Sequence, residues 1–167
     1  MLGTITPPSR WIDQHLPAAQ PGGTALDLAC GSGRHTRLLL ARGYQVTAVD
    51  RDISRLETAP GLEAMQADLE DGSPWPLPGQ RFDAVVVTDY LHRPLFPAIS
   101  AALAPGGVLL YETFAVGNEK YGKPSNPNFL LRDGELLEMA RQFGLRVLAY
   151  EATDDGAAVK QRIAARR

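Results

Sequence analysis

Two short apolar runs, one followed by a glycine-rich turn and one ending in an acid, constrain the fold of this chain most strongly. The first, Ala25–Ala29, leads through Gly31 and Gly33 into a helical pattern, and the second, Val46–Asp50, ends in a carboxylate. Glycine lets a backbone turn sharply and approach a ligand where a Cβ would interfere. A strand, a glycine turn, a helix and a second strand ending in an acid are typical of a sheet edge that binds the ribose and tail of a nucleoside-type ligand.

The residues around the glycines indicate which nucleoside ligand is expected. A dinucleotide fingerprint requires Gly or Ala at its third position, where this chain has the β-branched Thr36. Asp27 lies in the first strand just before the turn. Its carboxylate would repel a pyrophosphate but could receive, directly or through water, the ammonium of a methionine moiety. The pattern therefore favours S-adenosylmethionine (SAM) over NAD.

The order of apolar and amphipathic segments predicts an α/β fold with a doubly wound, mainly parallel seven-stranded sheet. Strands are expected at 24–29, 45–49, 63–67, 82–88, 107–114, 145–151 and 157–163, and helices at 34–42, 53–58, 95–103 and 133–143. Asp154-Asp155-Gly156 predicts a turn that joins the last two strands as an antiparallel hairpin. The dinucleotide-binding fold lacks such a hairpin.

The 167 residues are expected to form one domain, which leaves little room for a separate substrate domain. Residues 1–23 are interpreted as an N-terminal segment with a short amphipathic helix over 9–16. Residues 69–80 are predicted to be a surface loop. Residues 115–131 form a longer connection than usual, and because long loops are often functional, we expect a substrate loop there.

These motifs resemble the class I SAM-dependent methyltransferases. The resemblance rests, in the family's order, on Leu26–Gly33, Asp50, Ala67–Leu69, Arg81–Val87 and Leu103–Leu110. It implies methyl transfer from SAM, with S-adenosylhomocysteine as the product. A narrower resemblance, to small bacterial stand-alone methyltransferases grouped as tellurite-resistance-like, rests on Tyr90–Pro94, Tyr111–Phe114 and Gly117–Phe129. It implies no particular methyl acceptor.

The expected cofactor-binding residues surround the ends of the first four strands. Asp50 is placed to hydrogen-bond the ribose hydroxyls, with a strand-end cap as the alternative. Asp68 is placed to accept from the adenine amino group, with a turn acid as the alternative. The full predicted set is Asp27, Ala29, Gly31, Gly33, Asp50, Arg51, Asp68, Leu69 and Thr88.

Candidate catalytic residues follow the fourth strand, where donor and acceptor should meet. Asp89, Tyr90 and His92 could each act as a general base or an orienting group, and His92 could equally be an ordinary hydrogen-bonding residue. Arg93 could bind an anionic acceptor or pair with Asp89. Glu112 lies in an apolar run and must therefore have a partner or face the site. The predicted substrate residues are Arg93, Glu112, Asn118, Tyr121 and Phe129, and no metal site is expected.

Charge and composition limit the partners. The net charge is −2, and four basic residues with no acid lie after Ala157, so residues 1–156 carry −6. The basic face that Lys160 and Arg162 form is interpreted as serving solubility and protection of a sheet edge, with RNA contact as the alternative. The single cysteine, Cys30, is expected to be a buried packing residue in a reducing compartment. No apolar run approaches a membrane span.

The sequence therefore predicts a cytoplasmic SAM-dependent methyltransferase, monomeric or homodimeric, that acts on a small molecule. Two alternatives remain open at this stage. One is methylation of a nucleic acid or a protein, and the other is a non-catalytic SAM-binding scaffold or regulatory subunit.

Overall fold

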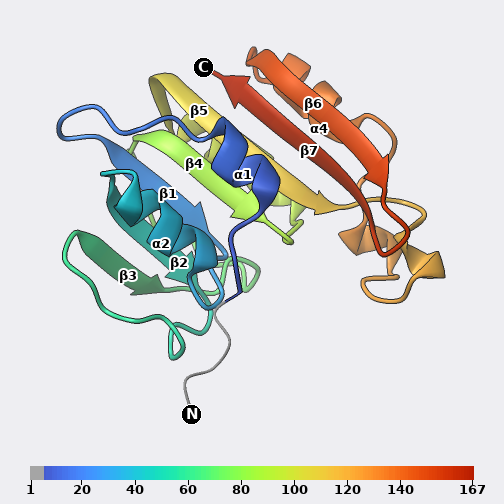
Figure 1. The fold of residues 1–167 in the computed structure, drawn as a ribbon, viewed down its shortest axis with the longest axis horizontal. Helices are drawn as coiled ribbons and strands as arrows, with labels where there is room; N and C mark the ends of the chain where they lie inside the picture. Colours follow the sequence, from blue (N-terminus) through green and yellow to red (C-terminus); the bar gives the residue numbers. More distant parts are fainter. Residues whose placement is uncertain (1–5) are drawn as a thin grey trace.

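Apolar runs covered on both faces become the strands of one sheet in the computed structural model, which describes residues 6–167 (Figure 1). The first five residues of the predicted domain and of its N-terminal segment (1–23) lie outside the described residues. The strands are β1 (Thr24–Leu28), β2 (Gln45–Asp50), β3 (Leu62–Gln66), β4 (Phe82–Thr88), β5 (Leu103–Phe114), β6 (Arg146–Asp154) and β7 (Val159–Arg166). The helices are α1 (Arg10–His15), α2 (Arg34–Ala41), α3 (Phe96–Ala101) and α4 (Glu135–Gln142), with 3₁₀ turns η1 (Arg93–Leu95), η2 (Asn118–Lys120) and η3 (Pro127–Phe129).

Over residues 6–167 the sheet has seven strands in the order β3-β2-β1-β4-β5-β7-β6. Strands β1 to β5 pair in parallel, whereas β7 is antiparallel to both β5 and β6. The predicted mainly parallel sheet with a C-terminal antiparallel hairpin is confirmed. The carboxyl ends of β1 to β5 consequently meet at one edge, where ligands bind in such sheets.

Helices cover both faces of the sheet because alternate strand residues point to opposite sides. In β4, Val85 and Val87 pack in the core beneath α3 and α4, whereas Ala84 and Val86 pack in the core beneath α1 and α2. Figure 1 shows α1 and α2 in front of the sheet and α4 behind β6 and β7. No helix within residues 6–167 is long and apolar enough to cross a membrane.

One predicted helix is wrong. Residues 53–58 are irregular apart from a turn at 54–55, because the Asp52 carboxylate accepts from the N–H of Ser54 at 2.9 Å and offers the backbone an alternative to a helix. A six-residue segment ahead of Pro60 is also too short to form a helix without strong packing. Residues 69–80 are irregular, as predicted. β5 begins four residues earlier than expected, at Leu103.

The interpretation of the basic face as edge protection is also wrong. β7 lies between β5 and β6, so it is an interior strand of the sheet and not an edge strand. Arg162 pairs with Glu112 at 2.6 Å, and Lys160 pairs with Asp89 at 2.8 Å. These cations therefore neutralise acids of neighbouring strands and connections.

Candidate active site

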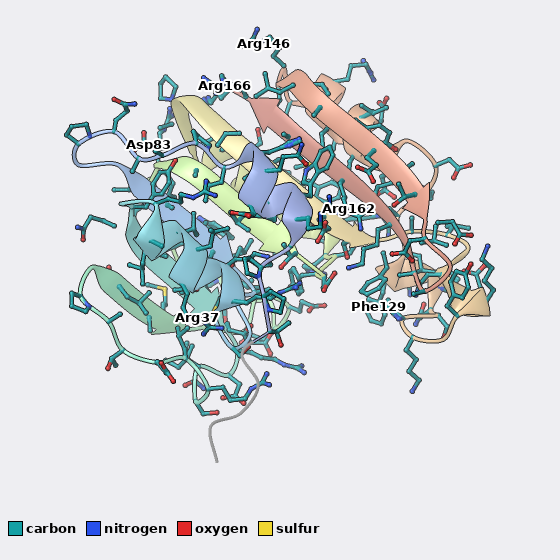
Figure 2. The ribbon with its side chains drawn as sticks, in the orientation of Figure 1. Arg37, Asp83, Phe129, Arg146, Arg162 and Arg166 are labelled. Carbon is teal, nitrogen blue, oxygen red and sulfur yellow. The ribbon has the colours of Figure 1, made fainter. Side chains whose placement is uncertain are left out.

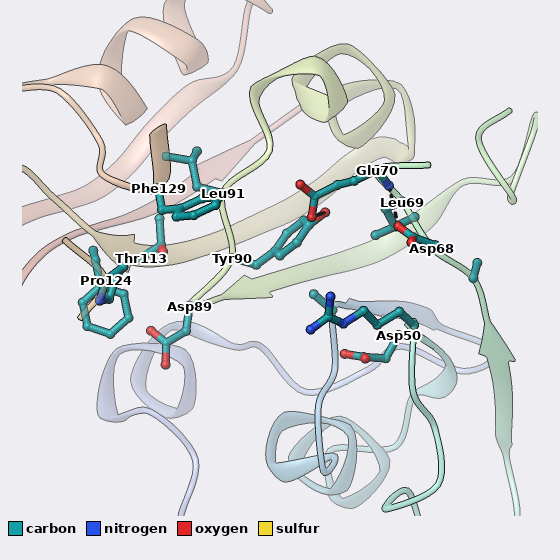
Figure 3. Close-up of a pocket in the computed structure, with 14 residues that line it drawn as sticks. Asp50, Asp68, Leu69, Glu70, Asp89, Tyr90, Leu91, Thr113, Pro124 and Phe129 are labelled. Carbon is teal, nitrogen blue, oxygen red and sulfur yellow. Dashed lines mark hydrogen bonds between the residues drawn. The ribbon is translucent and has the colours of Figure 1, made fainter. Parts of the chain in front are cut away.

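A cavity of about 380 Å³ opens where the parallel strands end (Figure 3). We call its two halves by the strands they follow. The β2–β3 end consists of Asp50, Arg51, Asp68 and Leu69, and the β4–β5 end consists of Asp89, Thr113, Phe114 and Phe129. Figure 3 shows Tyr90 between the two halves. Because the strand order places β1 between them, a ligand that fills both halves lies across the edge of the sheet.

Asp50 ties the end of β2 to the glycine turn after β1. One carboxylate oxygen accepts from the Gly31 N–H at 2.9 Å and the other from the Asp52 N–H at 3.0 Å. Gly31 has φ +56, a conformation that glycine adopts without steric cost. A carboxylate offers about four lone-pair positions. Asp50 is therefore fixed in place and still able to accept from ligand hydroxyls.

Gly33 keeps the same turn tight. It has φ +86, and a Cβ built on it would lie 2.5 Å from the Leu56 side chain. A larger residue would be strained at this φ, and the end of the Leu56 side chain would have to move to make room. The glycine requirement predicted from the sequence thus has a packing cause as well as a conformational one.

Asp68 and Leu69, with Arg51, form the rest of the β2–β3 end. The Asp68 carboxylate accepts from the Glu70 N–H at 2.9 Å, which fixes the turn after β3. Leu69 and Leu91 line the same cavity. Polar acceptors beside apolar walls are suited to a planar base with an exocyclic amino group.

Asp27 is buried and does not line the cavity. Its carboxylate accepts from the Thr36 hydroxyl at 2.7 Å. Burial raises the pKa of Asp27 to about 7, although the hydrogen bonds from Thr36 oppose this rise. Burial therefore favours the protonated form of this carboxyl more than it would in an exposed aspartate.

Asp89 forms the boundary of the β4–β5 end. Its φ of +52 is unusual for a residue other than glycine, and its N–H donates to the Glu112 carbonyl at 2.8 Å. Lys160 and Arg34 contact the Asp89 carboxylate at 2.8 Å and 3.3 Å. Neither cation lines the cavity. The Asp89 backbone thus adopts an uncommon conformation, and two cations outside the cavity hold its carboxylate in place.

The chain matches known proteins over this same region. The family "Methyltransferase domain" matches residues 25–107. A trans-aconitate 2-methyltransferase from Paracidovorax citrulli is 40% identical over 96 residues, which are 50% of this chain and 36% of the relative. Another, from Azoarcus sp., is 35% identical over 134 residues, which are 75% of this chain and 50% of the relative.

Solved structures share the fold. A SAM-dependent methyltransferase from Mesorhizobium loti superposes with TM-score 0.72 at 19% identity and covers 93% of this chain and 95% of its own. Haemophilus influenzae TehB has TM-score 0.66 at 20% identity, and the match covers 87% of this chain and 58% of TehB. Burkholderia thailandensis 1,6-didemethyltoxoflavin-N1-methyltransferase, with bound S-adenosylhomocysteine, has TM-score 0.63 at 20% identity. The match covers 87% of this chain and 71% of that enzyme.

The chain belongs to the class I SAM-dependent methyltransferases. The TehB neighbour fits the narrower resemblance at the level of the fold. The matched parts span between 36% and 50% of the length of these two curated relatives. Half or more of each relative therefore has no counterpart in the match.

The residues of the β2–β3 end fit SAM. Asp50 can accept from two ribose hydroxyls, and Asp68 lies beside the apolar wall that a purine requires. Arg51 also lines this end. The volume of about 380 Å³ is within the range of roughly 300–1,000 Å³ that is typical of ligand sites.

Glu70 links two predicted catalytic residues and was missed by sequence reasoning. The Tyr90 hydroxyl donates to Glu70 at 3.2 Å, and His92 Nδ1 lies 3.4 Å from the other carboxylate oxygen. His92 does not line the 380 Å³ cavity but faces a separate hollow with Trp75. Burial raises the pKa of Tyr90, and Glu70 raises it further. The Tyr90 hydroxyl therefore remains protonated at neutral pH.

Arg93 and Glu112 are engaged away from the cavity. Arg93 does not pair with Asp89 but makes two hydrogen bonds to Glu135, at 2.6 and 2.8 Å. Glu112 accepts from Arg162 at 2.6 Å and from the Ser9 hydroxyl at 2.9 Å, on the side of the sheet that α1 covers. Figure 2 shows Arg162 beside α1. Neither residue lines the cavity.

The predicted substrate loop (115–131) contributes only part of its expected residues to the cavity. Asn118 is buried and donates to the Pro124 carbonyl at 3.0 Å, and Tyr121 donates to Asp154 at 2.6 Å. Phe129 and Pro124 line the cavity, and the Phe129 residue is 48% exposed. The loop therefore reaches the cavity through two residues, and the positions of its other predicted residues depend on distant partners.

His35 connects the N-terminal segment to the site. The Ser9 N–H donates to its Nε2 at 3.0 Å, so the proton of the neutral ring is on Nδ1 and faces the Thr88 hydroxyl at 3.2 Å. Thr88 therefore supports His35 and does not line the cavity. Burial, with a smaller contribution from nearby Arg34, lowers the pKa of His35 to about 4.

Replacing His35 with glutamine is expected to make the protein's stability less sensitive to acid. A histidine whose pKa falls from 6.5 to about 4 on folding stabilises the protein above pH 6.5. That stabilisation is lost as the pH falls towards 4, because only the unfolded state takes up the proton. The difference in free energy of unfolding between wild type and His35→Gln should fall by about 2–3 kcal/mol from pH 7 to pH 4.5. Denaturant titrations at both pH values measure it, and a constant difference would contradict the assignment.

Proposed function

We propose that this protein transfers the methyl group of SAM to a small-molecule acceptor bound at the β4–β5 end of the cavity. The observation that carries this proposal is the continuity of the cavity. One space joins the Asp50–Asp68 side to the Asp89–Phe129 side, with Tyr90 between them. Two ligands in one such space are held close together, which is the main requirement of a displacement on an activated donor.

The donor is proposed to lie along the β2–β3 end. Asp50 accepts from the ribose hydroxyls. Asp68 accepts from the adenine amino group, and the backbone at Leu69 supports the adenine ring. Ala29, Gly31 and Gly33 let the backbone approach the donor. Asp27 acts on the methionine ammonium through water, because it is buried and does not line the cavity.

At the β4–β5 end, this chain's residues orient the acceptor. SAM, when bound, supplies an already activated methyl group. Asp89 is placed to accept a hydrogen bond, and the Tyr90 hydroxyl, whose proton goes to Glu70, keeps lone pairs that can also accept one. His92 can influence the reaction only through Glu70. A strong general base is therefore not built into the lining, and the acceptor must be nucleophilic with little help.

The trans-aconitate relatives and the −2 net charge also favour a small acceptor. The nucleic-acid alternative was motivated by the basic C-terminal residues, but Lys160 and Arg162 are engaged by Asp89 and Glu112. We place the protein in the cytoplasm on the basis of its single free thiol, Cys30, which is buried. A monomer or a homodimer is compatible with this proposal.

Formation of S-adenosylhomocysteine tests the proposal. Purified protein with SAM should form it when supplied with a panel of small nucleophiles, and not above background with bulk RNA or with a mixture of unrelated proteins. Turnover that depends on RNA or protein would move the alternative substrate to first place. SAM binding without turnover on any class of acceptor would favour a non-catalytic SAM-binding subunit.

A further inference from the structure

The β4–β5 end has the chemistry of a ring-binding site. Phe114 and Phe129 line it, and Tyr90 adjoins it. Phe129 is 48% exposed although it is a large apolar side chain. Figure 3 shows it at the side of the cavity opposite Asp68. Aromatic rings exposed in a cavity are best covered by another planar ring, since stacking adds to the burial of apolar area.

The charges of the cavity disfavour an anionic ligand. Its lining carries four carboxylates and one guanidinium, Arg51, which belongs to the β2–β3 end. The cations near the other end are already engaged: Arg34 and Lys160 with Asp89, and Arg93 with Glu135. Among residues 6–167, the lining of the β4–β5 end therefore offers no cation to a carboxylate. An anion bound there would lose hydration without gaining a partner.

The ion pairs that Asp89 makes with Arg34 and Lys160 disfavour a cationic ligand. Asp89 is the one carboxylate at the β4–β5 end, and two cations contact it. The ammonium of Lys160 also lies 4.5 Å from the centre of the Phe114 ring. A protonated amine approaching Asp89 would meet a carboxylate whose charge Lys160 and Arg34 already offset. Asp89 keeps lone pairs for a hydrogen bond, but it does not act as an unpaired anion.

We propose that the β4–β5 end binds an uncharged, planar aromatic or heteroaromatic acceptor, stacked against Phe129, whose N–H or O–H donates to Asp89. This inference rests on the proposed function, because it names the acceptor class of that same site. It separates this chain from its trans-aconitate relatives, whose named substrate is a tricarboxylate. The β4–β5 end would thus discriminate between acceptors by their charge and planarity when they bind.

A set of ligands built on one ring tests this proposal by affinity rather than by turnover. The probes are indole, 1-methylindole, indole-3-acetate and tryptamine, together with trans-aconitate. Protein saturated with S-adenosylhomocysteine is titrated with each probe, and binding is followed by ligand-observed NMR. Indole is expected to bind at least tenfold more tightly than the anionic and cationic probes. Its 1-methyl derivative should bind several-fold more weakly because the N–H is lost.

A variant pair locates the site. Phe129→Ala should weaken indole binding at least fivefold and leave the affinity for S-adenosylhomocysteine unchanged. Val116→Ala is the matched control, because Val116 lies in the same loop, is 49% exposed and does not line the cavity. It should change neither affinity.

The outcomes separate this inference from the function beneath it. Failure of S-adenosylhomocysteine to bind overturns both proposals. If it binds but trans-aconitate or a charged indole binds as tightly as indole, the inference alone is overturned. Unchanged indole affinity in Phe129→Ala also overturns it.

Discussion

Asp50→Ala is expected to weaken SAM binding by about 1–3 kcal/mol, or roughly 5- to 150-fold. The substitution removes the acceptors proposed for the ribose hydroxyls. It also leaves the Gly31 N–H without the carboxylate that holds it at 2.9 Å, so the glycine turn loses a restraint. Both effects act on the bound donor, and calorimetric titration with SAM measures their sum.

Asp52→Ala is the matched control for this prediction. Asp52 lies two residues away, does not line the cavity and uses its carboxylate to accept from the Ser54 N–H. Its replacement should leave SAM affinity near that of the wild type. Equal affinities for wild type and a folded Asp50→Ala variant would remove Asp50 from the donor site.

Arg93→Ala is expected to lower the free energy of unfolding by about 3–5 kcal/mol. Arg93 makes two hydrogen bonds to Glu135, whose side chain is only 7% exposed, and also donates to the Leu130 carbonyl at 2.8 Å. Burial raises the pKa of Glu135, but hydrogen bonds from Arg93 and the Arg132 N–H outweigh this and keep the pKa low overall. Removing the guanidinium would leave a buried carboxylate without its main partner.

A second pair on the same helix provides the comparison. Arg141 and Glu138 form an exposed ion pair in α4, and exposed pairs contribute little to stability. Arg141→Ala should therefore leave the denaturation midpoint nearly unchanged. The double variant Arg93→Met with Glu135→Leu should recover most of the loss, because it removes both charges. A small effect of Arg93→Ala alone would show that Glu135 finds another partner or takes up a proton.

The parts of the fold that could be predicted from the sequence depend on local signals. The turn between β1 and α2 follows from glycines that permit positive φ, and the order of strands follows from the apolar runs. Asp50 at the end of β2 and Asp68 after β3 line the cavity for the same reason, since an acid that follows a strand must lie at the carboxyl edge. The hairpin between β6 and β7 follows from the Asp-Asp-Gly turn.

The remaining features depend on residues distant in the sequence. Arg93 and Glu135 are separated by 42 positions, and Arg162 and Glu112 by 50. No local pattern indicates that these charges satisfy one another rather than a ligand. The insertion of β7 between β5 and β6 had the same effect, because it turned an expected exposed face into a paired one. Glu70 was missed because its role comes from contacts with Tyr90 and His92 across a loop.

The most direct test of the account is a calorimetric titration of ligand-free protein with SAM, with NADH titrated in parallel. The cavity at the ends of β2 and β3 predicts one SAM site of micromolar affinity and no heat of binding with NADH. NADH binding in place of SAM would show that the glycine turn serves a dinucleotide. The absence of SAM binding would contradict the central claim while leaving the fold as described.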